Sequence, residues 1–261
     1  MSLGYTVDQG VAVATLDRPD VLNAFNDDLG FALVERVREA AADDAVRCLV
    51  ITGAGRAFSS GEDLAALSGS YESGTAPDLG QTLINRYNPL IRAIRDTHKP
   101  VIAAVNGVAA GAGASLALAC DFRIASENAK LVLAFIKVGL VPDSGAVWFL
   151  ARMVGTATAY RIAAMGDPLS ADECLRLGLF DRVVPKESFA TEWMTFAAEM
   201  ASGPTEALAL TKRLVSFAAE HSLEEQLQEE VHAQTRAGKT DDHLEGVTAF
   251  LTKRRPNFKG R

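Results

Sequence analysis

One carboxylate stands in surroundings suited to proton transfer. Asp143 lies in the segment GLVPDSG, residues 139–145, within an apolar stretch that runs from Phe135 to Leu150. Apolar walls raise the pKa of a carboxyl group, and a carboxyl group with a raised pKa can take and return a proton near neutral pH. The same residue could instead cap a helix that begins at Ser144, which is the commoner role for an aspartate in such a place.

A second segment, NGVAAGAG at residues 106–113, could present backbone amides to an anion. It is not a P-loop, because no Gly-Lys-Ser/Thr follows, and it is not GxGxxG, because Leu116 takes the place of the third glycine. If a helix starts near Gly111, its first N–H groups and its dipole would favour a negative oxygen. Small residues here could equally serve close packing of the helix on a strand, and the residues leave both interpretations open.

Other kinds of chemistry find little support. Ser59-Ser60-Gly61 is not GxSxG, and no histidine is placed as an obvious partner for a nucleophilic serine. A metal site is not expected, because the histidines lack HExxH spacing and have no cysteine nearby. The three cysteines are scattered among apolar residues and are expected to be buried, reduced thiols. These residues are His98, His221, His232, His243, Cys48, Cys120 and Cys174.

Composition narrows the class of protein. The 261 residues are 48% hydrophobic and 23% charged, as in an ordinary globular protein, and the net charge of −7 argues against nucleic-acid binding. The first ten residues lack a basic segment followed by an apolar one, so no signal peptide is expected. The longest apolar run, Val108 to Cys120, is too short to cross a bilayer. A cytoplasmic location fits these features best.

Short strands and helices alternate along the first part of the chain, which predicts an α/β protein with parallel strands. Alternation around Gln9-Gly10 predicts a hairpin, and Asn26 can cap the helix that follows. The candidate loops come after buried segments, at the strand ends where α/β proteins bind ligands. The expected strands are residues 5–8, 11–16, 48–52, 101–105, 122–126 and 131–133, and the expected helices begin at 27, 83 and about 111.

After Pro142 the sequence predicts helices with short breaks. Two capping boxes, Ser170 with Glu173 and Ser222 with Glu225, mark helix starts, Gly203-Pro204 opens a helix with proline at its first position, and Thr240 caps the last one. We therefore divide the chain into an α/β core at 1–195 and a C-terminal helical region at 196–261. That region is too small to hold its own core, so it is expected to pack on the core or on another subunit.

Several motifs, in this order and spacing, resemble the crotonase (enoyl-CoA hydratase/isomerase) superfamily. They are Arg18-Pro19 with Leu22–Asn26, Ala57–Leu64, Lys99–Gly107 through Cys120-Asp121, and Glu245–Val247 through Lys253 to Phe258. The resemblance covers essentially the whole chain. It implies that superfamily's ββα spiral core, a C-terminal helical oligomerisation region, and a homo-trimer or a dimer of trimers.

The resemblance also implies a substrate class and its binding residues. The superfamily binds acyl-CoA thioesters, so coenzyme A is part of the substrate and no separate cofactor is expected. Two backbone N–H groups hold the thioester oxygen, and by motif position they belong to Glu62 and Ala112. Removing an α-proton places charge on that oxygen, where one such donor is worth ~10²–10³ in rate. Contacts to CoA are implied near Leu22, Ala24, Asp63 and Leu64, with Phe258 and Lys259 reaching a neighbouring subunit's CoA.

The departures from the superfamily pattern point to one kind of reaction. Hydratases of the superfamily carry two glutamates at the positions that Ser115 and Phe135 occupy here, whereas Asp143 falls where several isomerases carry their acid/base aspartate. The segments GLVPDSG and NGVAAGAG resemble the ring-epoxide isomerase branch, which converts 1,2-epoxyphenylacetyl-CoA into an oxepin and can shift Δ3 double bonds to Δ2. We therefore expect an acyl-CoA isomerase with Asp143 as its catalytic residue.

Three alternatives remain on these grounds. A hydratase would need an unrecognised acid, such as Glu62, to reach the substrate. A dehalogenase-like enzyme would use Asp143 as a nucleophile on an aryl ring, but that relative carries a tryptophan where Phe135 stands. A non-catalytic acyl-CoA binder would keep the fold and lose the chemistry. The acyl group itself is expected to lie against the Ser68–Gly80 loop, expected to be mobile, and the Leu83–Ile94 helix.

Overall fold

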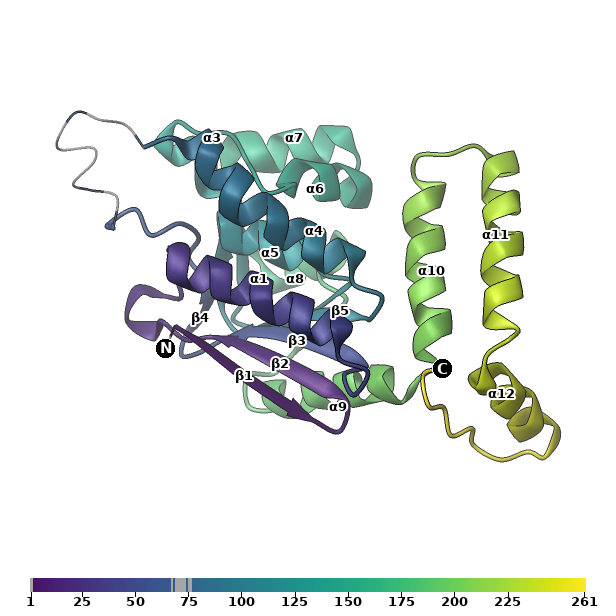
Figure 1. The fold of residues 1–261 in the computed structure, drawn as a ribbon. Helices are drawn as coiled ribbons and strands as arrows, with labels where there is room; N and C mark the ends of the chain where they lie inside the picture. Colours follow the sequence, from purple (N-terminus) through teal and green to yellow (C-terminus); the bar gives the residue numbers. More distant parts are fainter. Residues whose placement is uncertain (1, 67, 69–73, 75–76) are drawn as a thin grey trace.

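Two β-sheets form the core of the protein (Figure 1). The computed structural model describes residues 2–66, 68, 74 and 77–261. The larger sheet has the order β1-β2-β3-β5-β7-β10, antiparallel only between β1 and β2, and the smaller has the order β4-β6-β8-β9, antiparallel only between β8 and β9. The strands are β1 Leu3–Asp8, β2 Val11–Leu16, β3 Cys48–Gly53, β4 Ala57–Ser59, β5 Val101–Val105, β6 Val108–Ala110, β7 Phe122–Ser126, β8 Lys130–Val132, β9 Leu169–Ser170 and β10 Arg182–Val184.

The chain passes repeatedly from the large sheet to the small one. β3 is followed by β4, β5 by β6 and β7 by β8, each across a short link. The links are tight: a Cβ on Gly53 or on Gly107 would collide with a backbone carbonyl. Asn106 holds two of them together, because its Nδ2 donates to the carbonyls of Gly55 and Ala57, both at 3.1 Å. The ββα repeat confirms the predicted α/β class.

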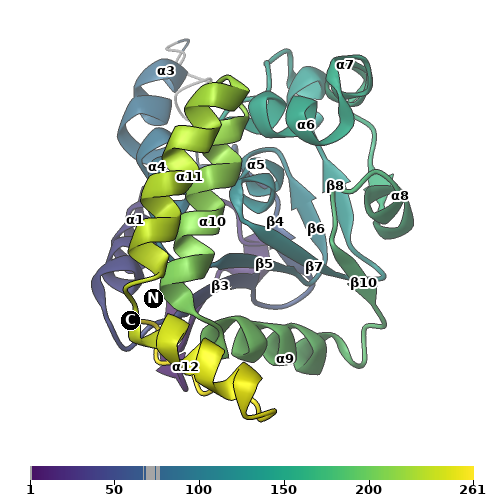
Figure 2. The same cartoon turned by 90° about the vertical axis from the view of Figure 1, so that its right-hand side faces the viewer.

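Helices cover the sheets on both sides (Figures 1 and 2). The main apolar core lies between the sheets and the helices α1, α4, α5, α6 and α7, and a smaller core lies under α9, where Phe189, Phe196 and Ala197 pack on β3, β5 and β7. The expected boundary at 195/196 falls inside α9. The elements are η1 Pro19–Val21, α1 Asp27–Ala42, α3 Leu79–Thr82, η2 Leu83–Tyr87, α4 Asn88–Asp96, α5 Ala112–Ala119, η3 Ala134–Val138, α6 Ala146–Val154, α7 Thr156–Met165, α8 Ala171–Arg176 and α9 Phe189–Ser202.

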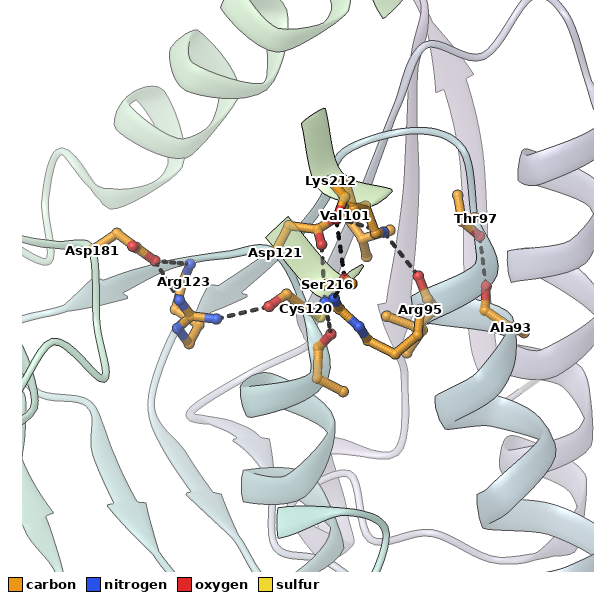
Figure 3. Close-up of polar contacts among 12 residues, drawn as sticks. Ala93, Arg95, Thr97, Val101, Cys120, Asp121, Arg123, Asp181, Lys212 and Ser216 are labelled. Carbon is orange, nitrogen blue, oxygen red and sulfur yellow. Dashed lines mark hydrogen bonds and ion pairs between the residues drawn. The ribbon is translucent and has the colours of Figure 1, made fainter. Parts of the chain in front are cut away.

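The last three helices, α10 Thr205–Ala218, α11 Leu223–Ala237 and α12 Asp241–Leu251, stand to one side of the core (Figures 1 and 2). A group of ion pairs attaches α10 (Figure 3). Lys212 donates to Oδ2 of Asp121 at 2.8 Å, and Arg95 donates to Oδ1 of Asp121 at 3.1 Å and to the Ser216 hydroxyl at 3.1 Å. The helical hairpin formed by α10 and α11 is therefore docked, through α10, by polar contacts to the end of α4 and to Asp121, the residue before β7.

Local capping signals predicted several helix starts correctly. The side chains of Asn26, Ser170, Ser222 and Thr240 each accept from a backbone N–H in the first turn, and both capping boxes are complete. One detail was wrong: Pro204 is the N-cap of α10 and not its first residue. The helix expected to start at Leu83 starts earlier, at Leu79, because α3 continues directly into the π-helical turn η2 and then into α4. In the part of the chain that the structure describes, no helix combines the length and apolarity needed to cross a membrane.

Candidate active site

A cavity of about 170 Å³ lies between the loop after β4, the start of α5, η2, η3 and the loop that precedes α6. It brings together Glu62, Ala112 and Asp143, three residues that the sequence predicts for the site, and Leu64 also lines it. The rest of its described lining is mostly apolar: Ser60, Leu79, Thr82, Leu83, Tyr87, Gly111, Ala134, Phe135, Val138 and Leu140.

The backbone around Gly61 turns the Glu62 N–H away from the adjacent segment at Phe25. The Gly61 carbonyl accepts from the Phe25 N–H at 2.7 Å, and the Gly61–Glu62 peptide is trans. In a trans peptide the N–H points opposite to the carbonyl, so the Glu62 N–H points away from Phe25. It donates to no acceptor among the described residues. Gly61 has φ of 92°, a conformation that suits glycine.

The Ala112 amide is free for a similar reason. Ala112 is the first residue of α5, and the preceding Gly111 carbonyl points along the helix, where it accepts from the Ser115 N–H at 3.0 Å. The Ala112 N–H therefore points back out of the helix start, and it too donates to no described acceptor. Gly61 and Gly111 pack together, since a Cβ on Gly111 would lie 3.8 Å from Gly61 Cα. Two free amides thus lie at one wall of the cavity, as an oxygen that gains negative charge requires.

Asp143 is a half-buried carboxyl group with a single hydrogen-bond donor among the described residues, the Ser144 hydroxyl, at 2.8 Å from Oδ1. Its pKa is raised above the ordinary value of 3.8, mainly because burial disfavours the charged form. The nearby Glu62 carboxylate raises that pKa further, whereas the Ser144 hydrogen bond and the Arg86 cation lower it. The environment is that of a carboxyl group suited to proton transfer.

The capping role considered for Asp143 is wrong. α6 begins at Ala146, its N-cap is Gly145, and no side chain caps it. Ser144 and Gly145 both have positive φ, 53° and 76°, so the chain makes a left-handed turn between Asp143 and the helix. It is the backbone carbonyl of Asp143 that accepts from the Ala146 N–H, at 2.9 Å, which leaves the carboxyl group free to face the cavity.

The two positions that supply the glutamates of hydratases offer no acid here. Ser115 is fully buried, and its hydroxyl donates to the backbone carbonyls of Gly111 at 3.2 Å and Asp143 at 3.1 Å. Phe135 lines the cavity with its ring. Among the described lining residues, the carboxyl groups are those of Glu62 and Asp143.

What holds the Glu62 side chain was not predicted from the sequence. Its Oε2 accepts from the Arg86 guanidinium and from the Tyr87 hydroxyl, both on η2. Arg86 is only 2% exposed and also pairs with Asp27, with Nη1 2.9 Å from Oδ1. One signal was available: Gly30 lies in the first turn of α1, where a glycine inside a helix usually has a packing reason, and a Cβ there would collide with the Arg86 side chain.

The residues implied for CoA fall into two groups. Leu22, Ala24 and Asp63 lie beside the cavity, because the segments around Leu22 and Ser60 run together, with the Ser60 N–H 2.9 Å from the Leu22 carbonyl. Arg18 fixes this edge, since it donates to the Ala24 carbonyl at 2.6 Å and to the Asp63 carboxylate at 2.9 Å. The Asp63 carboxylate is therefore paired with Arg18 within the protein.

Phe258 and Lys259 are not brought to this cavity. Arg47 donates to the Phe258 carbonyl at 2.9 Å, and the Lys259 N–H donates to Asp242 at 2.6 Å, so the tail is tied to the residue that precedes β3 and to the start of α12. Of the expected Ser68–Gly80 loop, residues 69–73, 75 and 76 lie outside those described. Leu79, which lies in α3, lines the cavity, as does Leu83 of the expected helix.

A larger cavity, about 770 Å³, lies between α10, α6 and the core. Asp121 is the one carboxylate in its described lining, and both of its oxygens are engaged by Arg95 and Lys212. It has no carboxyl group free for proton transfer, so the smaller cavity is the better candidate for the chemistry.

Comparison with known proteins identifies the family. The sequence profile described as enoyl-CoA hydratase/isomerase matches residues 6–261. The chain is 45% identical over 255 residues to the 1,2-epoxyphenylacetyl-CoA isomerase of Escherichia coli (strain K12), covering 98% of this chain and 97% of that protein. It is 36% identical to the 2,3-dehydroadipyl-CoA hydratase of the same organism, covering 97% and 96%.

A solved structure gives the same result for the fold. The enoyl-CoA hydratase from Bacillus anthracis superposes with a TM-score of 0.93 at 30% identity, covering 100% of both chains. The family profile, the full-length relatives and the ββα repeat all agree. The chain belongs to the enoyl-CoA hydratase/isomerase, or crotonase, family, whose enzymes act on acyl-CoA thioesters.

Proposed function

We propose that this enzyme is an acyl-CoA isomerase that uses Asp143 as its single acid/base. The observation that carries the proposal is the contrast within one cavity. Asp143 is a carboxyl group with a raised pKa, while a buried serine and a phenylalanine occupy the positions that supply the two glutamates of hydratases. A single carboxylate suffices for isomerisation, because no water has to be held or activated.

The proposed reaction needs only groups that line the cavity. The thioester oxygen accepts from the N–H groups of Glu62 and Ala112, and the Asp143 carboxylate takes a proton from C2 of a Δ3-enoyl thioester. The electrons of the broken C–H bond form an enolate, which the two amides stabilise. Protonated Asp143 returns the proton to C4 on the same face, and the double bond moves to Δ2.

Two substrate classes are supported. The 45%-identical relative is named for 1,2-epoxyphenylacetyl-CoA, and the cavity wall that includes Phe135, Leu83 and Leu140 is apolar enough for a ring or a short alkenyl group. We therefore propose a ring-epoxide or a Δ3-enoyl thioester as substrate.

Hydration is the alternative function, since relatives and solved structures carry hydratase names. It would require Glu62 to activate water. The Glu62 carboxylate already accepts from Arg86 and Tyr87, which disfavours that role. A binder without activity is the other alternative, and native mass spectrometry after incubation with acyl-CoAs would separate binding from turnover.

A turnover panel of Δ3-enoyl-, Δ2-enoyl- and 1,2-epoxyphenylacetyl-CoA tests the proposal. We expect conversion of the first or the last and little hydration of the second. Hydration as the dominant activity would replace isomerase with the alternative, and binding without conversion of any of the three would indicate a non-catalytic homologue.

We also propose that the protein assembles as a homo-trimer or a dimer of trimers. Large apolar side chains are exposed on the last three helices, and burying them needs a partner surface. A tail held away from its own cavity is compatible with contacts to a neighbour's CoA. Light scattering at micromolar concentration should show three or six subunits, and a stable monomer would contradict this. The exposed residues are Val215, Leu223, Leu227, Val231, Leu244, Val247, Phe250 and Leu251.

A further inference from the structure

We propose that Glu62 is a positioning residue of the reaction: its carboxylate is clamped as a fixed negative charge beside Asp143 and does not itself transfer the proton. This inference rests on the proposed role of Asp143 as the acid/base. Glu62 is the second carboxylate of the cavity, and Arg86 and Tyr87 are the groups that keep it in place.

The geometry of the clamp favours a fixed charge over a mobile acid. Oε2 of Glu62 accepts from both the Arg86 guanidinium and the Tyr87 hydroxyl. The guanidinium also lies over the Tyr87 ring, 4.6 Å from its centroid, and the ring packs edge-on against Phe25 with centroids 5.8 Å apart. A side chain held by a cation and a hydroxyl at one oxygen has little freedom to swing toward a substrate carbon.

The cation of the clamp is itself immobilised. Arg86 is buried beside Gly30 of α1, whose missing Cβ leaves room for the arginine stem. Its Nη1 pairs with Asp27 at the start of α1, while Nη2 pairs with Glu62. Three segments of the chain, α1, η2 and the loop after β4, are therefore joined through one guanidinium. The same loop carries the Glu62 N–H that is proposed to bind the thioester oxygen, so the clamp also steadies that peptide.

A fixed carboxylate beside Asp143 has a consequence for proton affinity. Two carboxylates that share a site disfavour each other's ionisation, and Glu62 raises the pKa of Asp143 in addition to the larger effect of burial. Among the described residues, Tyr87 and Arg86 are the other ionisable groups that act on this pair, both from η2. A more basic Asp143 is a better proton acceptor for a weakly acidic carbon.

Charges on the other elements around Asp143 are directed elsewhere. α5 carries no ionisable side chain. Of the cations on η3 and α6, Lys137 pairs with Asp167 at 3.0 Å and Arg152 pairs with Glu220 at 3.5 Å.

The test is the pH dependence of kcat/KM in Glu62→Gln, with Asp27→Asn as the matched control. Glutamine keeps the size and an acceptor oxygen but removes the charge, so the acid limb should move to lower pH while kcat at its plateau falls by less than about tenfold, against ~10²–10⁴ for loss of a proton-transferring group. Asp27→Asn removes a carboxylate from the same guanidinium, but Asp27 has a 75%-exposed side chain and does not line the cavity. Its acid limb should move less.

A second variant keeps the inference falsifiable if Glu62→Gln folds poorly. Tyr87→Phe removes one donor from the Glu62 carboxylate and keeps its charge, so the acid limb should stay at or above the wild-type midpoint. Three results would overturn the inference. The first is an acid limb that moves to lower pH in Tyr87→Phe, and the second is an acid limb that does not move in Glu62→Gln. The third is a fall of ~10²-fold or more in the plateau kcat of Glu62→Gln, which would assign proton transfer to Glu62.

Asp143→Asn separates this inference from the proposed function. If Asp143→Asn keeps its activity, the proposed isomerase mechanism fails whatever Glu62 does. If Asp143→Asn is inactive and Glu62→Gln gives one of the contrary results above, only the role of Glu62 fails.

Discussion

Two clusters of charged side chains lie at opposite ends of the helical segment formed by η2 and α4, and their carboxylates are paired to different degrees. The cavity cluster consists of Asp27, Glu62, Arg86 and Asp143, and the hairpin cluster consists of Arg95, Asp121 and Lys212. In the hairpin cluster two cations surround one carboxylate. The cavity cluster has one cation, Arg86, and three carboxylates. Arg86 forms ion pairs with Asp27 and Glu62 but not with Asp143.

The number of hydrogen-bond donors distinguishes Asp121, a structural carboxylate, from Asp143, the carboxyl group proposed to transfer a proton. Both oxygens of Asp121 are occupied, Oδ1 by Arg95 and Oδ2 by Lys212 and the Val101 N–H at 2.9 Å. Asp143 has one hydroxyl donor among the described residues and faces a mostly apolar cavity. Hydrogen bonds to a charged carboxylate favour its charged form, whereas burial without them favours the neutral form. A carboxyl group left with unused acceptor capacity in a cavity is the one available for catalysis.

The largest effect is expected from Asp143→Asn. Asparagine can still accept from the Ser144 hydroxyl, and the residue does not cap α6, so the fold should be retained. Loss of the base should lower isomerase turnover by ~10²–10⁴ while binding of the CoA thioester stays within a few-fold. Steady-state kinetics and titration calorimetry check the two parts. A variant with near-wild-type turnover would remove the distinction between the clusters.

The pH dependence of activity should report Asp143. Because only its ionised form accepts a proton, kcat/KM should fall as pH drops through a pKa that lies above the ordinary 3.8, raised mainly by burial. The measurement is a pH-rate profile on enzyme shown to stay folded across the range. A profile that is flat down to the ordinary carboxyl range would contradict the assignment.

A smaller effect, on stability and not on chemistry, is expected from Lys212→Met in the hairpin cluster. The methionine keeps an apolar stem, but Asp121 loses one of its donors and α10 loses its ion pair with the core. We expect a loss of about 1–3 kcal/mol in the free energy of unfolding, measured by denaturant titration.

The same variant provides a catalytic control. Where Lys212→Met is folded and assembled, the acid limb of the pH-rate profile should coincide with that of the wild type, because Lys212 does not line the catalytic cavity. A shifted limb would mean that the two clusters are coupled through α4.

Much of the fold could be predicted because its signals are local. Alternation gave the hairpin of β1 and β2, and capping side chains such as Asn26 and Ser222 marked the helix starts. The cavity residues Glu62, Ala112 and Asp143 lie in loops beyond buried segments, which parallel topology brings to one place. The helix-capping rule failed at Asp143. A left-handed turn at Ser144 and Gly145 separates Asp143 from the start of α6, and the Ser115 hydroxyl binds the Asp143 carbonyl.

The clamp on Glu62 could not be read from the sequence, because it depends on packing between distant segments. Arg86 on an amphipathic helix looks like any solvent-facing cation, yet it is buried and reaches both Glu62 and Asp27. Only Gly30, a glycine inside a helix, hinted that something must fit against α1.

We propose that one free carboxyl group makes this enzyme an isomerase and not a hydratase. The direct measurement is kcat/KM for hydration of crotonyl-CoA and for isomerisation of a Δ3-enoyl or epoxide substrate on one preparation. Ser115 and Phe135 cannot activate water, and the Glu62 carboxylate is already held by Arg86 and Tyr87, so hydration should be at least ~10²-fold slower. Hydration at a rate equal to or above isomerisation would contradict the account.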